Sequence, residues 1–394
     1  MKRWLSHLVV AGLLAAACAT TGYAEDVFDR GLRNLDGQVS TDVRSKVNDV
    51  AQSIAAQAGR AYFDNAVFPT NLRYDAAGEP LGNRGGLYNE PFWTVGQREF
   101  LSGVYFSHWT FEEFDGDDLS NAFNIDEPFT VFADTPIPGV DTLRRTAVRG
   151  GADLDYDVLW ISAVYGLTDR IDVGLAVPMM WVEADATLDY GLHLQQVDRR
   201  VAPPVTTDIL PLTFVSNRRS RDEQGLGDII GRLKWNVFDE LKDDTPVSWT
   251  LGLDAKFPSG DEEDLLGTGN GAVRFRTQLA KDLDRFVPQL ELAYVVGEDD
   301  VADEDYNSFQ YKVSLPFLVS EFENSGGEAP GSLTIALELL GDMSELADHH
   351  DVAVSARLGL GHRFSFNGGV RIPYSSSDAL TPDWSPTVGV EFRW

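Results

Sequence analysis

Histidines that stand close to acidic residues are the side chains of this sequence most able to do chemistry. The run Asp348-His-His-Asp351 could bind a divalent metal, because imidazole nitrogens and carboxylates are common metal ligands. Neighbouring residues on an extended segment point to opposite sides, so at most one of these two histidines joins a site easily. Ser107 and His108 are adjacent in the same way, which separates a nucleophile from its base. We therefore predict a protein that is not an enzyme, with no catalytic residue, no metal site and no cofactor.

Charged side chains alternate with apolar ones along many segments. Asp228, Arg232 and Lys234 share one face of an expected strand, and the other face carries Leu233 and Trp235. In a membrane barrel the apolar face contacts lipid and the polar face lines the lumen. The alternation predicts a lumen with mixed charge. Its candidate selectivity residues are Asp228, Arg232, Lys234, Asp254, Lys256, Arg274, Arg276, Glu291, Lys312, Glu338, Arg357, Arg371 and Glu391.

Two interpretations of these charges remain open. Arg274 and Arg276 lie two residues apart near Lys256 of the preceding segment, and such a ladder could select anions or polar aromatic solutes. The alternative is a neutral network of ion pairs that supports the barrel wall, which the mixture of signs favours. Several expected inward positions are apolar, and they could line a path for hydrophobic solutes or pack against a plug. These positions are Leu159, Ile161, Met180, Val182, Ile230, Val287, Val295 and Leu340.

The charge balance excludes some partners. The chain of 394 residues has 62 acidic and 32 basic side chains, for a formal net charge of −30. Nucleic acid is therefore not an expected partner, because phosphate binding requires clustered Lys and Arg. Much of the acid falls in expected surface loops, including residues 261–264 and 298–305.

The first 24 residues have the pattern of a secretory signal peptide. Lys2 and Arg3 precede an apolar run, and small residues lead to an expected cleavage after Ala24. The single cysteine, Cys18, would be removed with this segment. No later stretch approaches the roughly 20 apolar residues that a spanning helix needs. A membrane form of this protein must therefore be a closed β-barrel, since lipid tolerates no unpaired backbone.

Residues 25–95 differ from the rest of the chain. A narrow apolar stripe that ends at Ile54 predicts one amphipathic helix between about Thr41 and Ala58. The stripe is too narrow to form a domain core. We expect this helix to plug a barrel lumen, to pack on its periplasmic rim, or to lie on the surface without a gating role. Residues 60–95 are rich in Gly, Pro and Asn, and we expect them to be irregular.

Residues 96–394 alternate expected strands with connectors. About twelve segments of roughly 10 residues show a period of two, which is the length that a tilted strand needs to cross a bilayer. The connectors alternate long and short, with long ones expected at 111–153 and 189–224 and a short turn at 167–170. Long outer loops and short periplasmic turns are typical of outer-membrane barrels. The sequence predicts an all-β fold, an antiparallel up-and-down transmembrane barrel of about 12 strands with a short, partly helical N-terminal segment.

The last eleven residues form one of these strands. Val388, Val390, Phe392 and Trp394 share an apolar face that ends on aromatic residues. This ending resembles the C-terminal signal by which bacterial outer-membrane barrels are handed to the barrel-assembly machinery. Gly389, Phe392 and Trp394 stand at the positions of that signal, so the resemblance implies that they act in membrane insertion.

Three motifs together resemble a known family. They are Tyr165-Gly-Leu-Thr-Asp-Arg-Ile-Asp-Val-Gly-Leu-Ala-Val-Pro178, Gly225-Leu-Gly-Asp-Ile-Ile-Gly-Arg-Leu-Lys-Trp235 and Lys256-Phe-Pro-Ser-Gly-Asp-Glu-Glu-Asp-Leu-Leu-Gly-Thr-Gly269. In this order they resemble the outer-membrane barrel family named for the phenol meta-degradation pathway, which is described as a family of candidate transporters. The resemblance covers roughly residues 98–394 and implies uptake of small aromatic or hydrophobic compounds. It supplies no ligand residues.

Two functions follow as expectations. The first is an outer-membrane channel or transporter for small solutes in a Gram-negative envelope, surrounded by lipid and monomeric. The second is a closed barrel that acts as an envelope enzyme or a surface-binding protein through its acidic outer loops.

Overall fold

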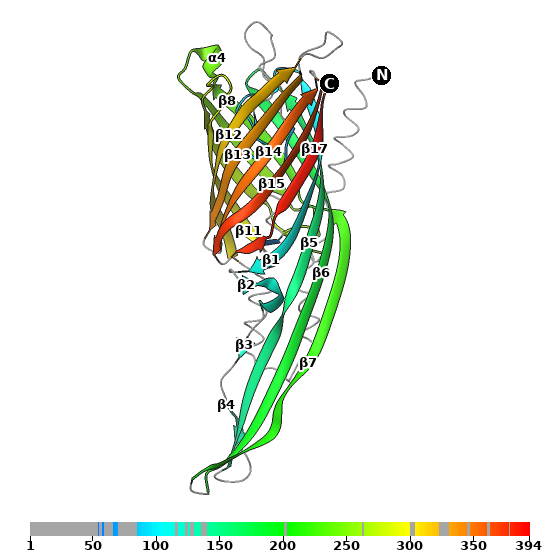
Figure 1. Ribbon diagram of the computed structural model, residues 1–394, viewed down its shortest axis with the longest axis vertical. Helices are drawn as coiled ribbons and strands as arrows, with labels where there is room; N and C mark the ends of the chain where they lie inside the picture. Colours follow the sequence, from blue (N-terminus) through cyan, green and yellow to red (C-terminus); the bar gives the residue numbers. More distant parts are fainter. Residues whose placement is uncertain are drawn as a thin grey trace.

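The fold is that of a computed structural model (Figure 1). It describes residues 54, 57–58, 66–69, 85–114, 117–122, 125–126, 130–134, 140–200, 203–261, 264–299, 304–322, 331–344, 347–360, 363–377 and 379–394. The expected signal peptide, residues 1–24, and most of the expected helix at 41–58 lie outside these ranges. Ile54, Gln57 and Ala58, at the end of that expected helix, are helical.

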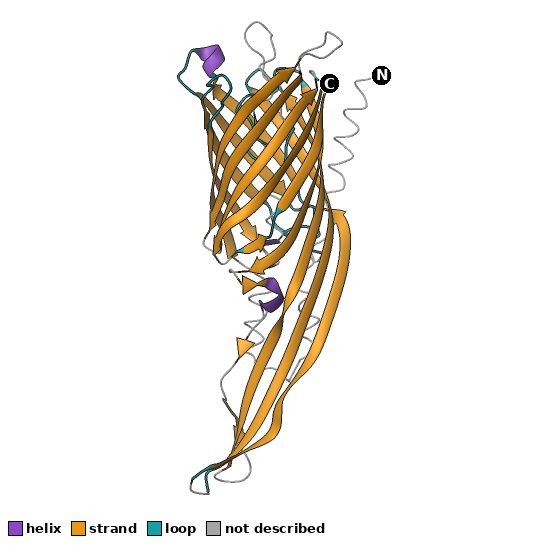
Figure 2. Ribbon diagram, viewed as in Figure 1, coloured by secondary structure: helices purple, strands orange, loops and turns teal. Residues whose placement is uncertain are grey.

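Twelve strands close into an antiparallel barrel, as Figure 2 shows. β1 is the closing strand, because it pairs with β5 on one side and with β17 on the other. The barrel strands are β1 Phe100–Phe114, β5 Val140–Gly166, β6 Ile171–Asp198, β8 Ile229–Phe238, β9 Ser248–Phe257, β10 Ala272–Ala280, β11 Gln289–Asp299, β12 Glu304–Phe322, β13 Gly331–Ser344, β14 Asp348–Leu360, β15 Phe364–Ser377 and β17 Ser385–Arg393. The remaining elements are β2 Asp117–Asp118, η1 Leu119–Asn121, β3 Ile125–Asp126, β4 Thr130–Asp134, β7 Val205–Leu226, α4 Glu240–Asp243 and β16 Leu380–Pro382. The predicted fold class is confirmed.

The barrel wall is apolar outside and polar inside. On β13, Ile335 and Leu337 are 42% and 48% exposed, whereas Thr334 and Glu338, which flank them, are each 1% exposed. Water would favour the reverse arrangement, because burying a charge costs far more than burying an aliphatic side chain gains. No helix among the described residues is long and apolar enough to cross a membrane.

The phase of β5 differs from the prediction. Leu159 and Ile161 were expected inside, but Ile161 is 47% exposed, and Val158 and Trp160 are the fully buried residues of this strand. The prediction placed Asp155 and Asp157 on the inner face, and this reversed the expected phase of the strand. Both residues lie toward the end of the barrel where β5 continues beyond it, and the outer wall can also be polar there. The other six apolar positions predicted to face inward are all buried: Met180, Val182, Ile230, Val287, Val295 and Leu340.

Three strands continue far beyond the barrel as a curved ribbon (Figure 1). The ribbon consists of residues 140–153 of β5, 184–198 of β6 and 205–220 of β7. β5 and β6 pair without a break from Val140↔Asp198 to Gly166↔Asp172. The prediction of loops at 111–153 and 189–224 is therefore wrong for most of their length. Outside a membrane neither face of a ribbon must be apolar throughout, so the alternation that revealed the barrel strands is absent there.

The end of the barrel opposite the ribbon carries the short turns, α4 and the C-terminus (Figure 1). Arg170, from the predicted turn at 167–170, contacts the turn between β8 and β9. Its guanidinium donates a 2.9 Å hydrogen bond to the carbonyl of Val237 and pairs with Asp243. The hydrogen bond from Arg170 lowers the pKa of Asp243, so this pair stays ionised at neutral pH.

Candidate functional site: the barrel lumen

A segment from the N-terminal region runs through the lumen. We call residues 85–95 the plug segment. Phe92 is fully buried, and Leu87, Trp93 and Val95 are buried as well. Earlier parts of the region are also inside, since Phe68 lies under the guanidinium of Arg232 at 3.6 Å from the ring centroid. The described residues of this region are thus packed against the inner side of the barrel wall, and the role of residues 25–95 as a plug, a rim element or a surface helix stays a prediction.

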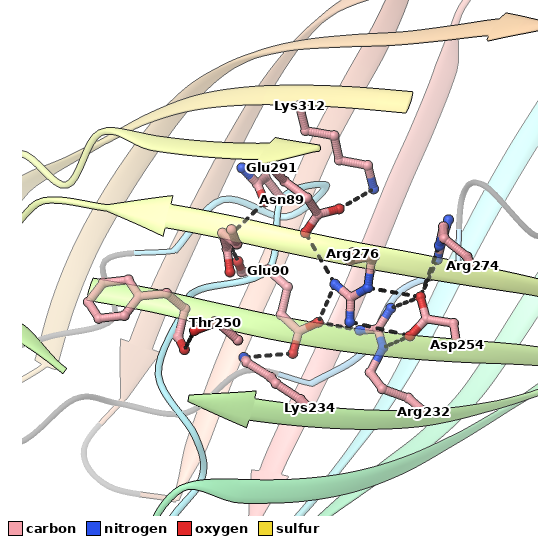
Figure 3. A network of polar contacts seen from close by, with 12 residues as sticks. Asn89, Glu90, Arg232, Lys234, Thr250, Asp254, Arg274, Arg276, Glu291 and Lys312 are labelled. Carbon is pink, nitrogen blue, oxygen red and sulfur yellow. Dashed lines mark hydrogen bonds and ion pairs between the residues drawn. The ribbon is translucent and has the colours of Figure 1, made fainter. Parts of the chain in front are cut away.

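Glu90 is the ionic centre of the plug segment. Its carboxylate pairs with Arg232, with Lys234 at 3.0 Å and with Arg276 at 3.6 Å. The ammonium of Lys234 also donates to the carbonyls of Pro91 at 2.5 Å and Trp93 at 2.8 Å. Figure 3 shows these side chains converging from β8 and β10 on the plug segment. The wall cations therefore bind both the acid and the backbone of the segment.

Asp254 of β9 is the acidic residue of the barrel wall that compensates the charge of three arginines. It is fully buried and accepts from Arg232 Nε at 2.8 Å, from Arg274 Nη2 at 2.7 Å and from Arg276 Nη2 at 3.3 Å (Figure 3). The strand register explains this convergence, because Asp254 is directly opposite Arg232 on β8 and Arg274 on β10. Glu291 extends the network, with Arg276 at 3.1 Å and Lys312 at 4.0 Å.

A second set of contacts holds the rest of the plug segment. Glu338 accepts the backbone N–H of Asn89 at 2.7 Å and the hydroxyl of Ser355 at 2.9 Å. Thr250 donates to the carbonyl of Phe92 at 2.8 Å, and the backbone N–H of Val95 donates to Asp172 at 2.8 Å. Polar groups of the segment thus find partners on several strands, as buried backbone groups require.

The thirteen predicted lumen residues all lie on the inner face, but they form separate groups. Eleven are buried, and Lys312 and Arg371 are half-buried. Arg357 pairs with Glu391 at 3.1 Å, and Arg371 pairs with Asp351. These two pairs and the Asp254 network join oppositely charged side chains, and the mixed-charge lumen stays a prediction. The role of these residues in selectivity stays a prediction.

Asp228 has a different task from the other luminal acids. Its carboxylate accepts the backbone N–H groups of Ser259 at 3.0 Å, Gly260 at 2.8 Å and Thr268 at 3.2 Å, and it lies 3.3 Å from Lys256 Nζ. Hydrogen bonds therefore join two of the three sequence motifs. Asp228, from the motif at 225–235, shapes the loop that belongs to the motif at 256–269.

Sequence reasoning missed the residues of the plug segment that make these contacts. Glu90 stands in a Gly-, Pro- and Asn-rich stretch with no periodic pattern, and its importance comes from cations that follow it by more than 140 residues. The sequence contains only an indirect indication of a missing negative partner, because basic side chains outnumber acidic ones on the neighbouring strands β8, β9 and β10. These basic residues include Arg232, Lys234, Arg274 and Arg276.

The histidines make local contacts. His108 Nδ1 lies 2.8 Å from Asp157, and His349 Nε2 lies 2.7 Å from Asp351. Among the described residues no group of three or more His, Cys, Asp and Glu side chains is arranged to hold a metal ion.

The C-terminal strand places its three predicted signal residues in distinct surroundings. Phe392 and Trp394 face outward, and the indole of Trp394 donates to Ser102 Oγ at 3.1 Å. Gly389 lies inside, directly opposite Tyr105. Tyr105 is fully buried, and its hydroxyl donates to Glu391 at 2.6 Å. Their role in membrane insertion stays a prediction.

Substitution of Gly389 is expected to destabilise the barrel. A Cβ at this position would lie 2.1 Å from Cδ1 of Tyr105, so Gly389→Ala must displace the buried ring and its hydrogen bond. Overpacking of this kind costs about 1–3 kcal/mol. Gly368 on the adjacent β15 is the matched control, because a Cβ there meets nothing closer than 3.9 Å. The urea midpoint of the refolded protein should fall for Gly389→Ala and not for Gly368→Ala, and equal midpoints would contradict this packing.

No family model matches the chain, and no curated protein matches it. Solved structures do. An outer membrane channel from Pseudomonas putida F1 is 11% identical over 77% of this chain and 98% of its own, with a TM-score of 0.42. A Pseudomonas aeruginosa FadL homologue is 9% identical over 83% and 98%, with a TM-score of 0.31. The Ralstonia pickettii toluene transporter TbuX is 8% identical over 76% and 90%, with a TM-score of 0.33. At these values the likenesses carry no argument about function, and the family resemblance of the motifs stays a prediction.

Proposed function

We propose that this protein is an outer-membrane channel for small aromatic or hydrophobic solutes, with a lumen that the plug segment closes at rest. One observation supports this most directly: a barrel with an apolar outer wall holds buried charges that bind a segment of its own N-terminal region. Charges in a membrane protein are costly unless they pair or face water, and they commonly mark the solute pathway. Here the pathway would open when the plug segment leaves Glu338, Asp172 and the cations that bind Glu90.

A reversible lock tests whether the plug segment must move. The backbone nitrogen of Leu87 lies 3.2 Å from Ser355 Oγ, so the two residues are close enough to bridge. The mature chain is expected to lack cysteine, so the double variant Leu87→Cys/Ser355→Cys contains one possible disulfide. Uptake of labelled single-ring aromatic compounds by cells should stop when this bridge is oxidised and return with reductant. Each single cysteine variant is the control. Unchanged uptake in the oxidised variant would contradict a moving plug.

The orientation in the outer membrane is a further expectation. The ribbon should lie outside the cell, and α4 should face the periplasm, because long extensions face outward in these barrels. Arg200 near the ribbon tip and Lys242 in α4 are matched probes, since each side chain is 55% exposed. On intact cells a membrane-impermeant maleimide should label Arg200→Cys, and it should label Lys242→Cys only after permeabilisation. The reverse pattern would contradict the orientation.

The ribbon supports a second candidate function. It projects well beyond the barrel (Figure 2), and none of its pairing contributes to barrel closure. A surface-binding protein would use such an extension as its working part. Replacing residues 186–219 with a short turn separates the two functions, because it should remove surface binding and leave solute uptake unchanged.

A further inference from the structure

A cavity of about 120 Å³ is lined by residues of β1, β12–β15, β16 and β17. Gln57 of the N-terminal region forms part of its lining, and its side-chain oxygen accepts the backbone N–H of Leu380 at 2.5 Å. A dry apolar cavity of roughly 150 Å³ is known to hold a benzene molecule. This cavity therefore has the size of a single-ring compound.

One side of the cavity is apolar and aromatic. Trp109 and Phe111 of β1 contribute two rings, and Leu340 and Leu380 complete this side. Each of these four side chains is 3–6% exposed, so they hold their positions within packed walls. A flat apolar ring would replace water against this surface, which favours its binding.

The other side of the cavity carries the ammonium group of Lys312, which is more exposed than the cations of the Asp254 network. The side chain of Lys312 is 17% exposed, whereas the cations of the Asp254 network, Arg232, Arg274 and Arg276, are at most 7% exposed. The ammonium of Lys312 lies 4.0 Å from Glu291 and donates to the carbonyl of Tyr88 at 3.2 Å. An ammonium has three N–H donors, so Lys312 has capacity for an anionic acceptor in the cavity.

The remaining charges limit what that anion can be. Arg371 also lines the cavity, but Asp351 already compensates its charge. Asp342 lies at the same cavity and accepts a 3.0 Å hydrogen bond from Gln310. Its negative charge repels every negative charge on a ligand, so a ligand with one negative charge is favoured over one with two.

From this arrangement we propose that the cavity is a binding site for a single-ring aromatic monocarboxylate. The carboxylate accepts from Lys312, and the ring lies against Trp109, Phe111 and Leu340. This inference rests on the proposed channel function and specifies its solute class. It also gives Lys312 a role in selectivity that Arg232, Arg274 and Arg276, which are bound within the Asp254 network, do not share.

Direct binding to the full-length protein in detergent tests the site. Benzoate is the probe, with calorimetry and tryptophan fluorescence as readouts. We expect Lys312→Met to weaken benzoate binding by about tenfold or more, as loss of a charged hydrogen bond does. Lys312→Arg should retain binding within about threefold, because it keeps the charge and donors. Lys281→Met is the matched control, since Lys281 is 40% exposed and pairs with Glu240 outside the cavity.

A ligand series keeps the test informative if Lys312→Met fails to fold. Three related compounds should each bind more weakly than benzoate. Benzamide lacks the negative charge, acetate lacks the ring, and phthalate carries a second carboxylate. The proposal is overturned if wild-type protein does not bind benzoate, if benzamide or acetate binds equally well, or if Lys312→Met leaves binding unchanged. The proposed channel function stands or fails separately, through uptake in the Leu87→Cys/Ser355→Cys lock.

Discussion

Asp254→Ala is expected to be the most damaging single change in the lumen. The substitution leaves Arg232, Arg274 and Arg276 without the buried carboxylate that all three contact. Removing one member of a buried ion pair costs about 3–5 kcal/mol, because the partner charge stays buried and uncompensated. The urea midpoint of the refolded barrel in detergent, followed by its heat-modified migration on gels, should fall accordingly.

Two comparisons make this expectation specific to the network. Asp254→Ala combined with Arg274→Met should recover part of the lost stability, since the second change removes one uncompensated charge. Asp198→Ala removes an exposed acid that pairs with Arg200 on the ribbon, and it should leave the midpoint unchanged. A midpoint for Asp254→Ala equal to that of the wild type would show that the three arginines do not need Asp254 to compensate their charge.

Glu90→Arg is expected to open the lumen. The new guanidinium would lie among Arg232, Lys234 and Arg276, where Glu90 now supplies the opposing charge. Repulsion replaces three attractions, and each 1.4 kcal/mol lost shifts the closed-to-open ratio by about tenfold. Cells that carry this variant should become sensitive to large hydrophilic antibiotics that the wild-type barrel excludes.

Glu99 provides the control for that substitution. It also pairs with an arginine, Arg393, at 3.0 Å, but it lies after the plug segment and is 37% exposed. Glu99→Arg should therefore leave antibiotic sensitivity unchanged. If Glu90→Arg and Glu99→Arg give the same sensitivity, the charge of Glu90 does not hold the plug segment in place.

The barrel could be predicted from sequence because each of its strands carries the evidence within its own residues. Lipid outside and polar groups inside impose a period of two on each strand, and β13 shows this from Leu333 to Leu339. The same logic failed for the ribbon, where neither face has to be apolar. It also failed at β5, where Asp155 and Asp157 lie on the outer wall and reversed the expected phase.

The plug segment could not be predicted because its contacts are remote in sequence. Glu90 meets Arg232 and Lys234 across 142 and 144 residues, and Asn89 meets Glu338 across 249. No local pattern in a Gly- and Pro-rich stretch specifies such partners. The charged residues of the wall could be named from the sequence, but the partners that they bind followed only from the fold.

Conductance of the refolded protein in a planar bilayer tests the central claim most directly. The full-length mature chain and a variant that lacks residues 25–95 should be compared at the same protein density. The expected result is a chain that is silent when intact and forms steady channels once those residues are removed. Steady channels in the intact protein, or silence in both, would contradict a lumen that the N-terminal region closes.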